Sequence, residues 1–219
     1  MNRLAIFDCD GTIVDSQANI CMAMEDCFAQ AGLEVPDRAR TRRVVGLSLV
    51  EAMRAMLPDA EPETHAALAE DYKLAFQRLR GRGLVEEPLY EGVADLIEQL
   101  EAEGWLLGVA TGKSDRGLRL CLERHGLHPR FMTLQTADRH PSKPHPSMIE
   151  LAMAEAGAAP ETTVMIGDTS YDMAMARAAG VTAVGVTWGY HEAEELKAAG
   201  ADYITEHPSE IATLVKALA

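Results

Sequence analysis

Residues 4–12 read LAIFDCDGT, a short apolar run that ends in two aspartates and a glycine. A short apolar run bounded by turn residues is typical of a strand buried in a parallel sheet. Because side chains alternate along an extended backbone, Asp8 and Asp10 leave the strand end on the same side and Cys9 points away. Gly11 provides the backbone freedom that a tight turn requires. The stretch therefore predicts a buried strand whose carboxyl end carries two acidic side chains.

The rest of the chain alternates short apolar runs with helical patterns, which is typical of a parallel sheet joined by crossover helices. Further strands are expected at residues 106–110, 132–134, 164–166, 183–186 and 202–204. Helices are expected at residues 93–103, 115–125, 146–156, 171–179 and 209–218. Four of these helical patterns are closely followed by glycine, as C-terminal helix stops are. The pattern predicts an α/β fold.

Residues 16–84 break this alternation, because they contain helical patterns and no strand pattern. The helices are expected at residues 17–31, 37–45, 49–56 and 63–79. Segments 12–16 and 81–88 have the composition of linkers, and the second holds two glycines and a proline. We therefore expect a helical subdomain at residues 16–84, inserted into a core formed by residues 1–15 and 85–219.

Charge and composition restrict the partners of the chain. Asp and Glu number 34 against 20 Lys and Arg, a net charge of −14, and such a surface repels nucleic acid. No apolar run approaches the ~20 residues of a membrane span, and the first residues lack a signal-peptide pattern. The four cysteines form no CxxC pair. We expect a cytoplasmic protein with reduced thiols, no nucleic-acid or membrane partner, and no sequence signal that sets the number of subunits.

The two carboxylates at the first strand end suit phosphoryl transfer. Asp8 can attack phosphorus and form an aspartyl phosphate, which divides a slow hydrolysis into two easier steps. Asp10 can protonate the leaving oxygen and then take a proton from water. The alternative is a turn rich in Asp and Gly with no catalytic role. In open α/β sheets ligands bind at the carboxyl ends of strands, so other strand ends should supply the remaining groups.

Two further segments are candidates for binding the phosphoryl oxygens. Thr111 and Gly112 follow the strand at residues 106–110 and can form a phosphate cradle, although the same segment also fits a helix start capped by Ser114. Lys143 precedes a proline, which favours extended backbone, and its ammonium can hold Asp8 and the phosphoryl oxygens together. The alternative for this lysine is a solvent-facing side chain.

The fourth strand end carries the expected metal ligand. Asp168 follows the strand at residues 164–166, and Asp172 lies one helical turn further on, where it can support the same site from behind. The oxygens of Asp8, Asp168 and the Asp10 carbonyl make a ligand set that suits Mg²⁺ and leaves room for water and a phosphate oxygen. The alternative role of Asp168 is helix capping.

The chain resembles the haloacid dehalogenase-like hydrolase superfamily in four motifs. The motifs are Asp8–Thr12, Thr111, Lys143 and Gly167–Asp172. The helical insert is similar to the C1-type cap of the phosphoglycolate phosphatase-like and β-phosphoglucomutase-like branch. The resemblance implies a Rossmann-like core and a cap that closes over the site. It also implies a nucleophilic Asp8, an acid/base Asp10, phosphoryl binding by Thr111 and Lys143, and Mg²⁺ binding by Asp168 beside Asp8.

Other segments are similar to phosphoglycolate phosphatases, namely Val45–Ser48, Val186–Tyr190 and Gly200–Ile204. Two positions depart from the resemblance. Gly112 stands where relatives often have Asn, which removes a side-chain donor and should widen the phosphate pocket. Cys9 stands where relatives commonly have a larger apolar residue. Both departures bear on the substrate rather than on the reaction.

We expect a magnesium-dependent phosphatase that acts on a small phosphorylated metabolite such as 2-phosphoglycolate. A phosphomutase of the β-phosphoglucomutase type, a pyrophosphatase or nucleotidase, and a catalytically silent regulator are the alternatives. Substrate choice is expected to lie in the helical insert, where Arg43 is a candidate ligand for a substrate carboxylate. The alternative for Arg43 and its neighbouring arginines is a solvated cationic helix face.

Overall fold

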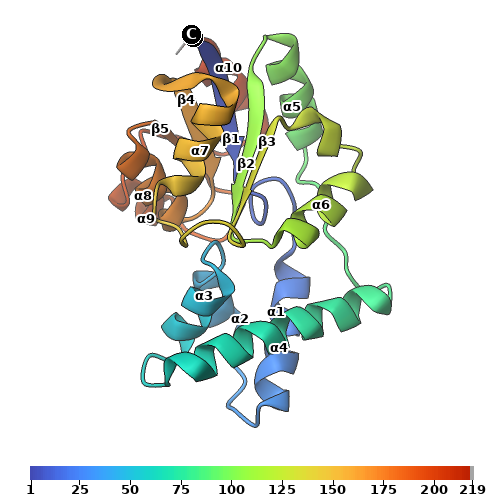
Figure 1. Ribbon diagram of the computed structural model, residues 1–219. Coiled ribbons are helices and arrows are strands. Elements are labelled where there is room, and N and C mark those ends of the chain that lie inside the picture. Colours follow the sequence, from blue (N-terminus) through green and yellow to red (C-terminus); the bar gives the residue numbers. More distant parts are fainter. Residues whose placement is uncertain (218–219) are drawn as a thin grey trace.

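Six parallel strands form one sheet in the computed structural model, which describes residues 1–217 (Figure 1). The strand order is β3-β2-β1-β4-β5-β6, which is the Rossmann-like order. All strands are parallel, and the order in which the chain adds them switches from one side of β1 to the other between β3 and β4. The strands are β1 (Asn2–Phe7), β2 (Leu106–Thr111), β3 (Thr133–Thr136), β4 (Ala158–Gly167), β5 (Thr182–Val186) and β6 (Tyr203–Thr205). The expected α/β fold is confirmed. Residues 218 and 219, where the last expected helix ends, lie outside the described residues.

The helices of the core follow the sequence pattern with two additions. They are α5 (Val93–Ala102), α6 (Asp115–Arg124), α7 (Ser147–Ala156), α8 (Ser170–Ala179), α9 (Ala193–Ala198) and α10 (Pro208–Ala217), with a 3-10 turn η1 (His128–Arg130). Neither α9 nor η1 was expected. Strand β4 also begins earlier than expected, at Ala158, which pairs with Asn2 before the register shifts. The first residues of β4 are only partly buried, so no apolar run marks them as strand.

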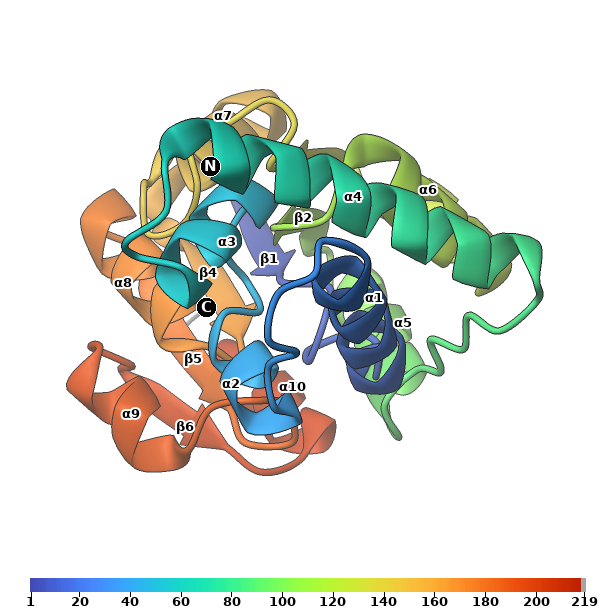
Figure 2. The ribbon, with the colours of Figure 1, turned by 90° about the horizontal axis from the view of Figure 1, so that it is seen from below.

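The remaining four helices, which we call the cap, lie beyond the carboxyl ends of the strands (Figure 1). They are α1 (Gln17–Gln30), α2 (Arg38–Arg43), α3 (Leu49–Met56) and α4 (Pro62–Gly81). Figure 2 shows the cap from below, with α4 running across the end of the sheet toward α6. The cap has its own apolar cluster, which includes Met24, Phe28, Met53 and Leu68. Within residues 1–217, none of the helices combines the length and apolar character that crossing a membrane requires.

The two linkers between core and cap lie side by side. Val14 and Leu89 form an antiparallel bridge. On either side of it, the Asp15 N–H donates to the Pro88 carbonyl over 2.8 Å and the Tyr90 N–H donates to the Ile13 carbonyl over 3.1 Å. The chain therefore leaves the core and returns to it through one short, paired connection.

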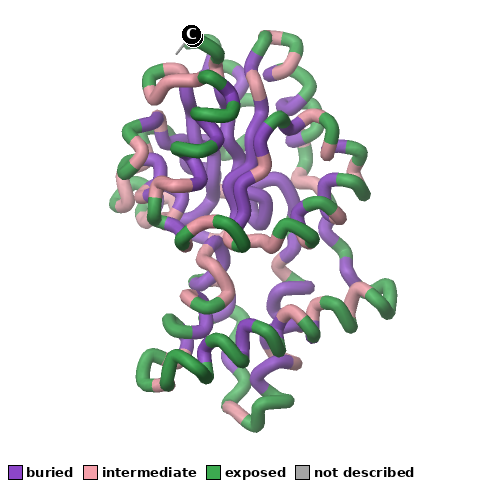
Figure 3. The backbone as a smooth tube through the Cα atoms, in the orientation of Figure 1, coloured by how far each residue is buried: buried purple, intermediate pink, exposed green. Residues whose placement is uncertain are grey.

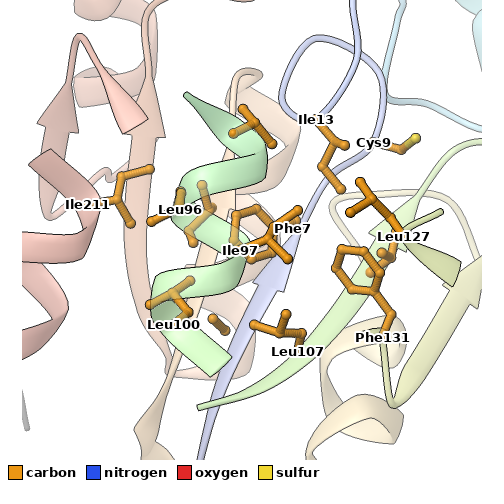
Figure 4. Packing of buried hydrophobic residues seen from close by; sticks show 14 of the residues in the cluster. Phe7, Cys9, Ile13, Leu96, Ile97, Leu100, Leu107, Leu127, Phe131 and Ile211 are labelled. Atoms are coloured by element: carbon orange, nitrogen blue, oxygen red, sulfur yellow. The ribbon is translucent and has the colours of Figure 1, made fainter. Parts of the chain in front are cut away.

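The alternation of side chains along β1 creates two apolar cores. Leu4 and Ile6 face α7, α8 and α9, whereas Ala5 and Phe7 face α5, α6 and α10. Figure 3 shows the central strands as the buried part of the molecule, and Figure 4 shows Phe7 among side chains of α5 and its neighbouring strands. Because β1 is buried on both faces and fixed on both edges, its carboxyl end is a rigid support for the residues that follow it.

Candidate active site

The carboxyl ends of β1 and β4 bring three carboxylates together. These strands are neighbours, with Phe7 beside Ile166, so Asp8 and Asp168 emerge next to each other at the point where the strand order reverses. Asp172 joins them from the first turn of α8. One oxygen of each carboxylate lies within 4.8 Å of the others, and all three residues are buried.

Lys143 is the one cation in direct contact with this cluster among the described residues. Its Nζ lies 3.0 Å from Asp8 Oδ1 and 2.6 Å from Asp172 Oδ1, and its side chain is buried. Burial alone would lower the pKa of Lys143, but the Asp172 and Asp8 carboxylates outweigh that effect and raise it, so the ammonium keeps its charge. Three carboxylates against one ammonium leave an excess of negative charge.

Burial and the neighbouring negative charges both raise the pKa values of Asp8 and Asp168. Burial raises the pKa of Asp8 to about 7, although Lys143 opposes the rise. Burial, followed by the Asp8 charge, raises the pKa of Asp168 well above its usual range. Asp8 Oδ2 is buried and has no hydrogen-bond partner within residues 1–217. A set of hard oxygen donors with surplus negative charge and an unsatisfied oxygen fits a divalent cation such as Mg²⁺.

Asp8 and Asp168 accept hydrogen bonds from different groups. Asp8 Oδ1 accepts from the Cys9 N–H over 2.6 Å, whereas Oδ2 has no hydrogen-bond partner among the described residues. Asp168 accepts from Thr12 Oγ1 and from the Tyr190 N–H, each over 2.9 Å. These contacts hold both aspartates in fixed orientations.

Asp172 has both of its oxygens engaged. Oδ1 contacts Lys143, while Oδ2 accepts from the Thr169 N–H over 3.0 Å and from Thr169 Oγ1 over 2.7 Å. These bonds include a capping box at the start of α8. The carboxylate therefore orients Lys143 and supports the site from behind.

Gly11 makes room for this arrangement. It has a φ of +86°, a backbone conformation that favours glycine, and a Cβ built on it would lie 2.2 Å from Asp168 Oδ2. The turn after β1 thus needs glycine both for its conformation and for the close approach of Asp168.

Asp10 forms an ion pair with Lys113, a contact that the sequence patterns did not predict. The Lys113 Nζ lies 2.5 Å from Asp10 Oδ1 and 2.9 Å from Glu87 Oε1, and the Ser16 hydroxyl also donates to Asp10. Burial would lower the pKa of Lys113, but Asp10 and Glu87 outweigh it and the net shift is upward. Lys113 lies two residues after Thr111 in the sequence. Glu87 lies in a linker, and no sequence spacing marks Glu87 as the partner of Lys113.

Thr111 and Gly112 lie where β2 ends, as expected. Thr111 is buried and lines the cavity, and its Oγ1 accepts from the Lys113 N–H over 3.2 Å. The expected widening of the pocket at Gly112 is not found. A Cβ built on Gly112 would lie 2.6 Å from the Leu47 carbonyl oxygen and 2.9 Å from that of Gly46, because the cap loop occupies this space.

The structure does not bring Arg43 into the cavity. Its Nη1 lies 2.5 Å and 2.6 Å from the two carboxylate oxygens of Glu195 on α9, and its carbonyl accepts from the Tyr171 hydroxyl over 3.0 Å. Ser48 adds a further contact, since its N–H donates to Ser142 Oγ over 2.8 Å. Arg43 therefore lies at a contact between cap and core, a role that depends on how distant segments dock.

A cavity of about 490 Å³ lies between the cap and the strand ends. The core contributes Asp8, Asp10, Thr111 and Gly112 to its lining, and the cap contributes side chains of α1, α3 and α4. Lys143 and Asp168 do not line the cavity. They lie buried, Lys143 in contact with Asp8 and Asp168 beside it.

Residues 5–186 match the family described as haloacid dehalogenase-like hydrolase. The chain belongs to this family.

Individual relatives are named as phosphatases. The chain is 37% identical to "Probable phosphatase IndB" of Dickeya dadantii, over 100% of this chain and 95% of that protein. It is 32% identical to a phosphoglycolate phosphatase of Synechococcus elongatus, over 97% of each chain. A crystal structure described as a predicted phosphatase from Clostridium acetobutylicum superposes with a TM-score of 0.88 at 27% identity, over 99% of each chain.

Proposed function

We propose that the protein is a magnesium-dependent phosphatase that hydrolyses a small phosphate monoester through an aspartyl phosphate on Asp8. The observation that carries the proposal is the state of the Asp8 carboxylate. Oδ1 is held by Lys143 and the Cys9 N–H, while Oδ2 has no partner in the part of the chain that the structure describes, and the residue lines the cavity. An oriented nucleophile with one free oxygen is the requirement for in-line attack on phosphorus.

The neighbouring side chains supply the other functions that phosphoryl transfer needs. Asp10 lines the same cavity and is the acid that protonates the leaving oxygen and later the base that accepts a proton from water. Thr111 binds the phosphoryl oxygens at the cavity wall, and Lys143, which is buried beside Asp8, adds the positive charge that offsets theirs. Asp8, Asp168 and the Asp10 carbonyl would hold Mg²⁺, with Asp172 in support. The ion would neutralise charge on the phosphate.

Some relatives are named phosphoglycolate phosphatases, so 2-phosphoglycolate is one of the small monoesters to be tested. The experiment is a Mg²⁺-supplemented screen of phosphate monoesters with inorganic phosphate as the readout, together with mass spectrometry of acid-quenched enzyme for a phosphorylated Asp8 peptide. Release of phosphate with phosphorylated Asp8 supports the proposal. Interconversion of sugar phosphates without net release identifies a phosphomutase, and cleavage of pyrophosphate alone identifies a pyrophosphatase.

Metal removal is expected to abolish turnover. Because three buried carboxylates face one ammonium, an anionic phosphate cannot approach Asp8 until a divalent cation offsets the charge. In EDTA, release of phosphate should fall to the background rate, and added Mg²⁺ should restore it. Asp168→Asn should raise the Mg²⁺ concentration for half-maximal rate by at least about tenfold. Full activity of EDTA-treated, dialysed protein would exclude the metal role.

Gly112→Ala is expected to displace the cap loop. The added Cβ would overlap the backbone carbonyls of Gly46 and Leu47, which cannot rotate away as a side chain can. We expect kcat/KM to fall by about tenfold to 10²-fold through misplacement of the cap. Gly81→Ala is the matched control, because it adds the same methyl group to another part of the cavity lining, where nothing lies within 4 Å of the built Cβ. Equal kinetics for the two variants would show that the loop does not need this contact.

Arg43→Ala tests whether this arginine binds substrate or joins the cap to the core. Its ion pair with Glu195 is largely exposed, so its removal should change the free energy of unfolding by no more than about 1 kcal/mol. We expect KM values for phosphates with and without a carboxylate to change together. A selective increase of KM for carboxylate-bearing substrates, measured in steady-state kinetics, would instead favour direct substrate binding.

A further inference from the structure

The cavity extends from the catalytic carboxylates into a groove between α4 of the cap and α6 of the core. These two helices face each other in both ribbon views (Figures 1 and 2). The α4 residues of the lining fall at the spacing of one helix face; they are Tyr72, Lys73, Phe76, Gln77, Arg80 and Gly81. From α6 the lining includes Arg116, Gly117 and Leu120. Each helix therefore presents one face to the same space.

Away from Asp8 and Asp10, the lining of the groove holds more cations than acids, although the protein as a whole is acidic. Apart from Asp8 and Asp10, the charged lining residues are one acid and four cations: Asp138, Lys73, Arg80, Lys113 and Arg116. Asp138 is turned toward the backbone, since its Oδ2 accepts from the Asp115 N–H over 2.9 Å. An excess of cations in a cavity attracts an anionic ligand even when the net charge of the whole chain is −14.

The cations differ in how far their charge is already used. Lys113 and Arg80 both contact Glu87, and Lys73 pairs with Glu70 on its own helix. Arg116 forms no ion pair with any acidic residue of the part of the chain described. Because it lies on the first turn of α6 rather than at the strand ends, Arg116 is placed to meet a group on the substrate that is remote from the phosphate.

The groove also has apolar walls. Phe76 from α4 and Leu120 from α6 line it from opposite sides, and Ile20, Met24 and Leu49 continue the apolar surface in the cap. A volume of about 490 Å³ falls within the range of about 300–1,000 Å³ that pockets for drug-sized ligands have. A two-carbon acid phosphate would leave most of this surface uncovered.

We propose that the preferred substrates are phosphate monoesters in which an apolar, ring-sized body separates the phosphate from a second anionic group, and that Arg116 binds that group. The proposal rests on the proposed function, because the phosphate must lie at Asp8. Phe76 and Leu120 contact the body of the substrate, and Lys73 adds charge from the cap side of the groove. The cap and the core then each contribute to recognition of the leaving group.

The test compares 4-carboxyphenyl phosphate with phenyl phosphate in the full chain with Mg²⁺. The two esters differ by one remote carboxylate, so the ratio of their kcat/KM values reports the anionic subsite. We expect this ratio to exceed about tenfold in the wild type and to fall on the order of tenfold in Arg116→Gln. Arg119→Gln is the matched control, because Arg119 lies on the same helix, pairs with Glu123 and does not line the cavity. It should keep the wild-type ratio.

Two results would overturn this inference and leave the phosphatase proposal intact. One is an unchanged ratio of the two kcat/KM values in Arg116→Gln, and the other is efficient hydrolysis of 2-phosphoglycolate with neither aryl ester cleaved. Calorimetric binding of 4-carboxyphenyl phosphate to the Asp8→Asn protein, with and without Arg116→Gln, tests the subsite without turnover. Weakening of the dissociation constant by about tenfold supports the subsite, and equal affinity refutes it. If no ester is hydrolysed, the phosphatase proposal is refuted. The binding measurement would still show whether Arg116 binds the second anionic group in the groove.

Discussion

Asp8→Asn should reduce kcat for every phosphate monoester by on the order of 10⁵-fold or more, because under the proposed function it removes the nucleophile and with it the two-step route. The substitution retains the size of the side chain and its contact with the Cys9 N–H. It also removes one of three buried carboxylates that face a single ammonium, so the folded state should be no less stable in metal-free buffer. Phosphate release and urea denaturation are the two measurements.

Asp95→Asn is the matched control for this variant. Asp95 lies exposed on α5, away from the cavity, and should keep wild-type kinetics. Turnover within tenfold of wild type in Asp8→Asn would mean that the reaction does not pass through this residue. Unfolding of the variant would instead point to a structural role for the Asp8 charge.

Lys143→Met should have the largest effect on stability. The ammonium is fully buried between Asp8 and Asp172, and its removal leaves two buried carboxylates without their cation. Loss of one partner from a buried ion pair typically costs about 3–5 kcal/mol, and we expect the free energy of unfolding to fall by that amount in EDTA. Under the proposed function activity should be lost as well, because the same ammonium orients Asp8 and offsets the charge of the phosphoryl group.

The control and the rescue separate these two effects. Lys197→Met removes an exposed lysine that pairs with Glu194, and should change the free energy of unfolding by less than about 0.5 kcal/mol. Adding Asp172→Asn to Lys143→Met should recover part of the lost stability and none of the activity. A loss below about 1 kcal/mol in Lys143→Met alone would contradict the buried-pair argument.

The sequence was sufficient to predict the sheet because its strands are buried and therefore apolar. It also placed Asp8 and Asp168 at strand ends, and strand order in the folded sheet brought them together. Where polarity hides a strand, as in the first residues of β4, the prediction was wrong in its bounds. The six-residue helix α9 is too short to show a clear period and was missed.

Contacts between cap and core could not be predicted in the same way. The pairing of Arg43 with Glu195 depends on how the cap docks on the core, and that of Lys113 with Glu87 depends on where the returning linker meets the end of β2. No local pattern encodes that geometry. The role of Gly112 is of the same kind, since its missing side chain has meaning only beside the backbone of the cap loop.

The bridge between Val14 and Leu89 has a consequence for how this protein can change over evolution. Since the two attachment points touch, the intervening segment can be exchanged for another of different length without stretching the sheet that carries the aspartates. The cap can thus be replaced as a whole, with a change in the lining of the cavity, while the aspartates of the core stay in place.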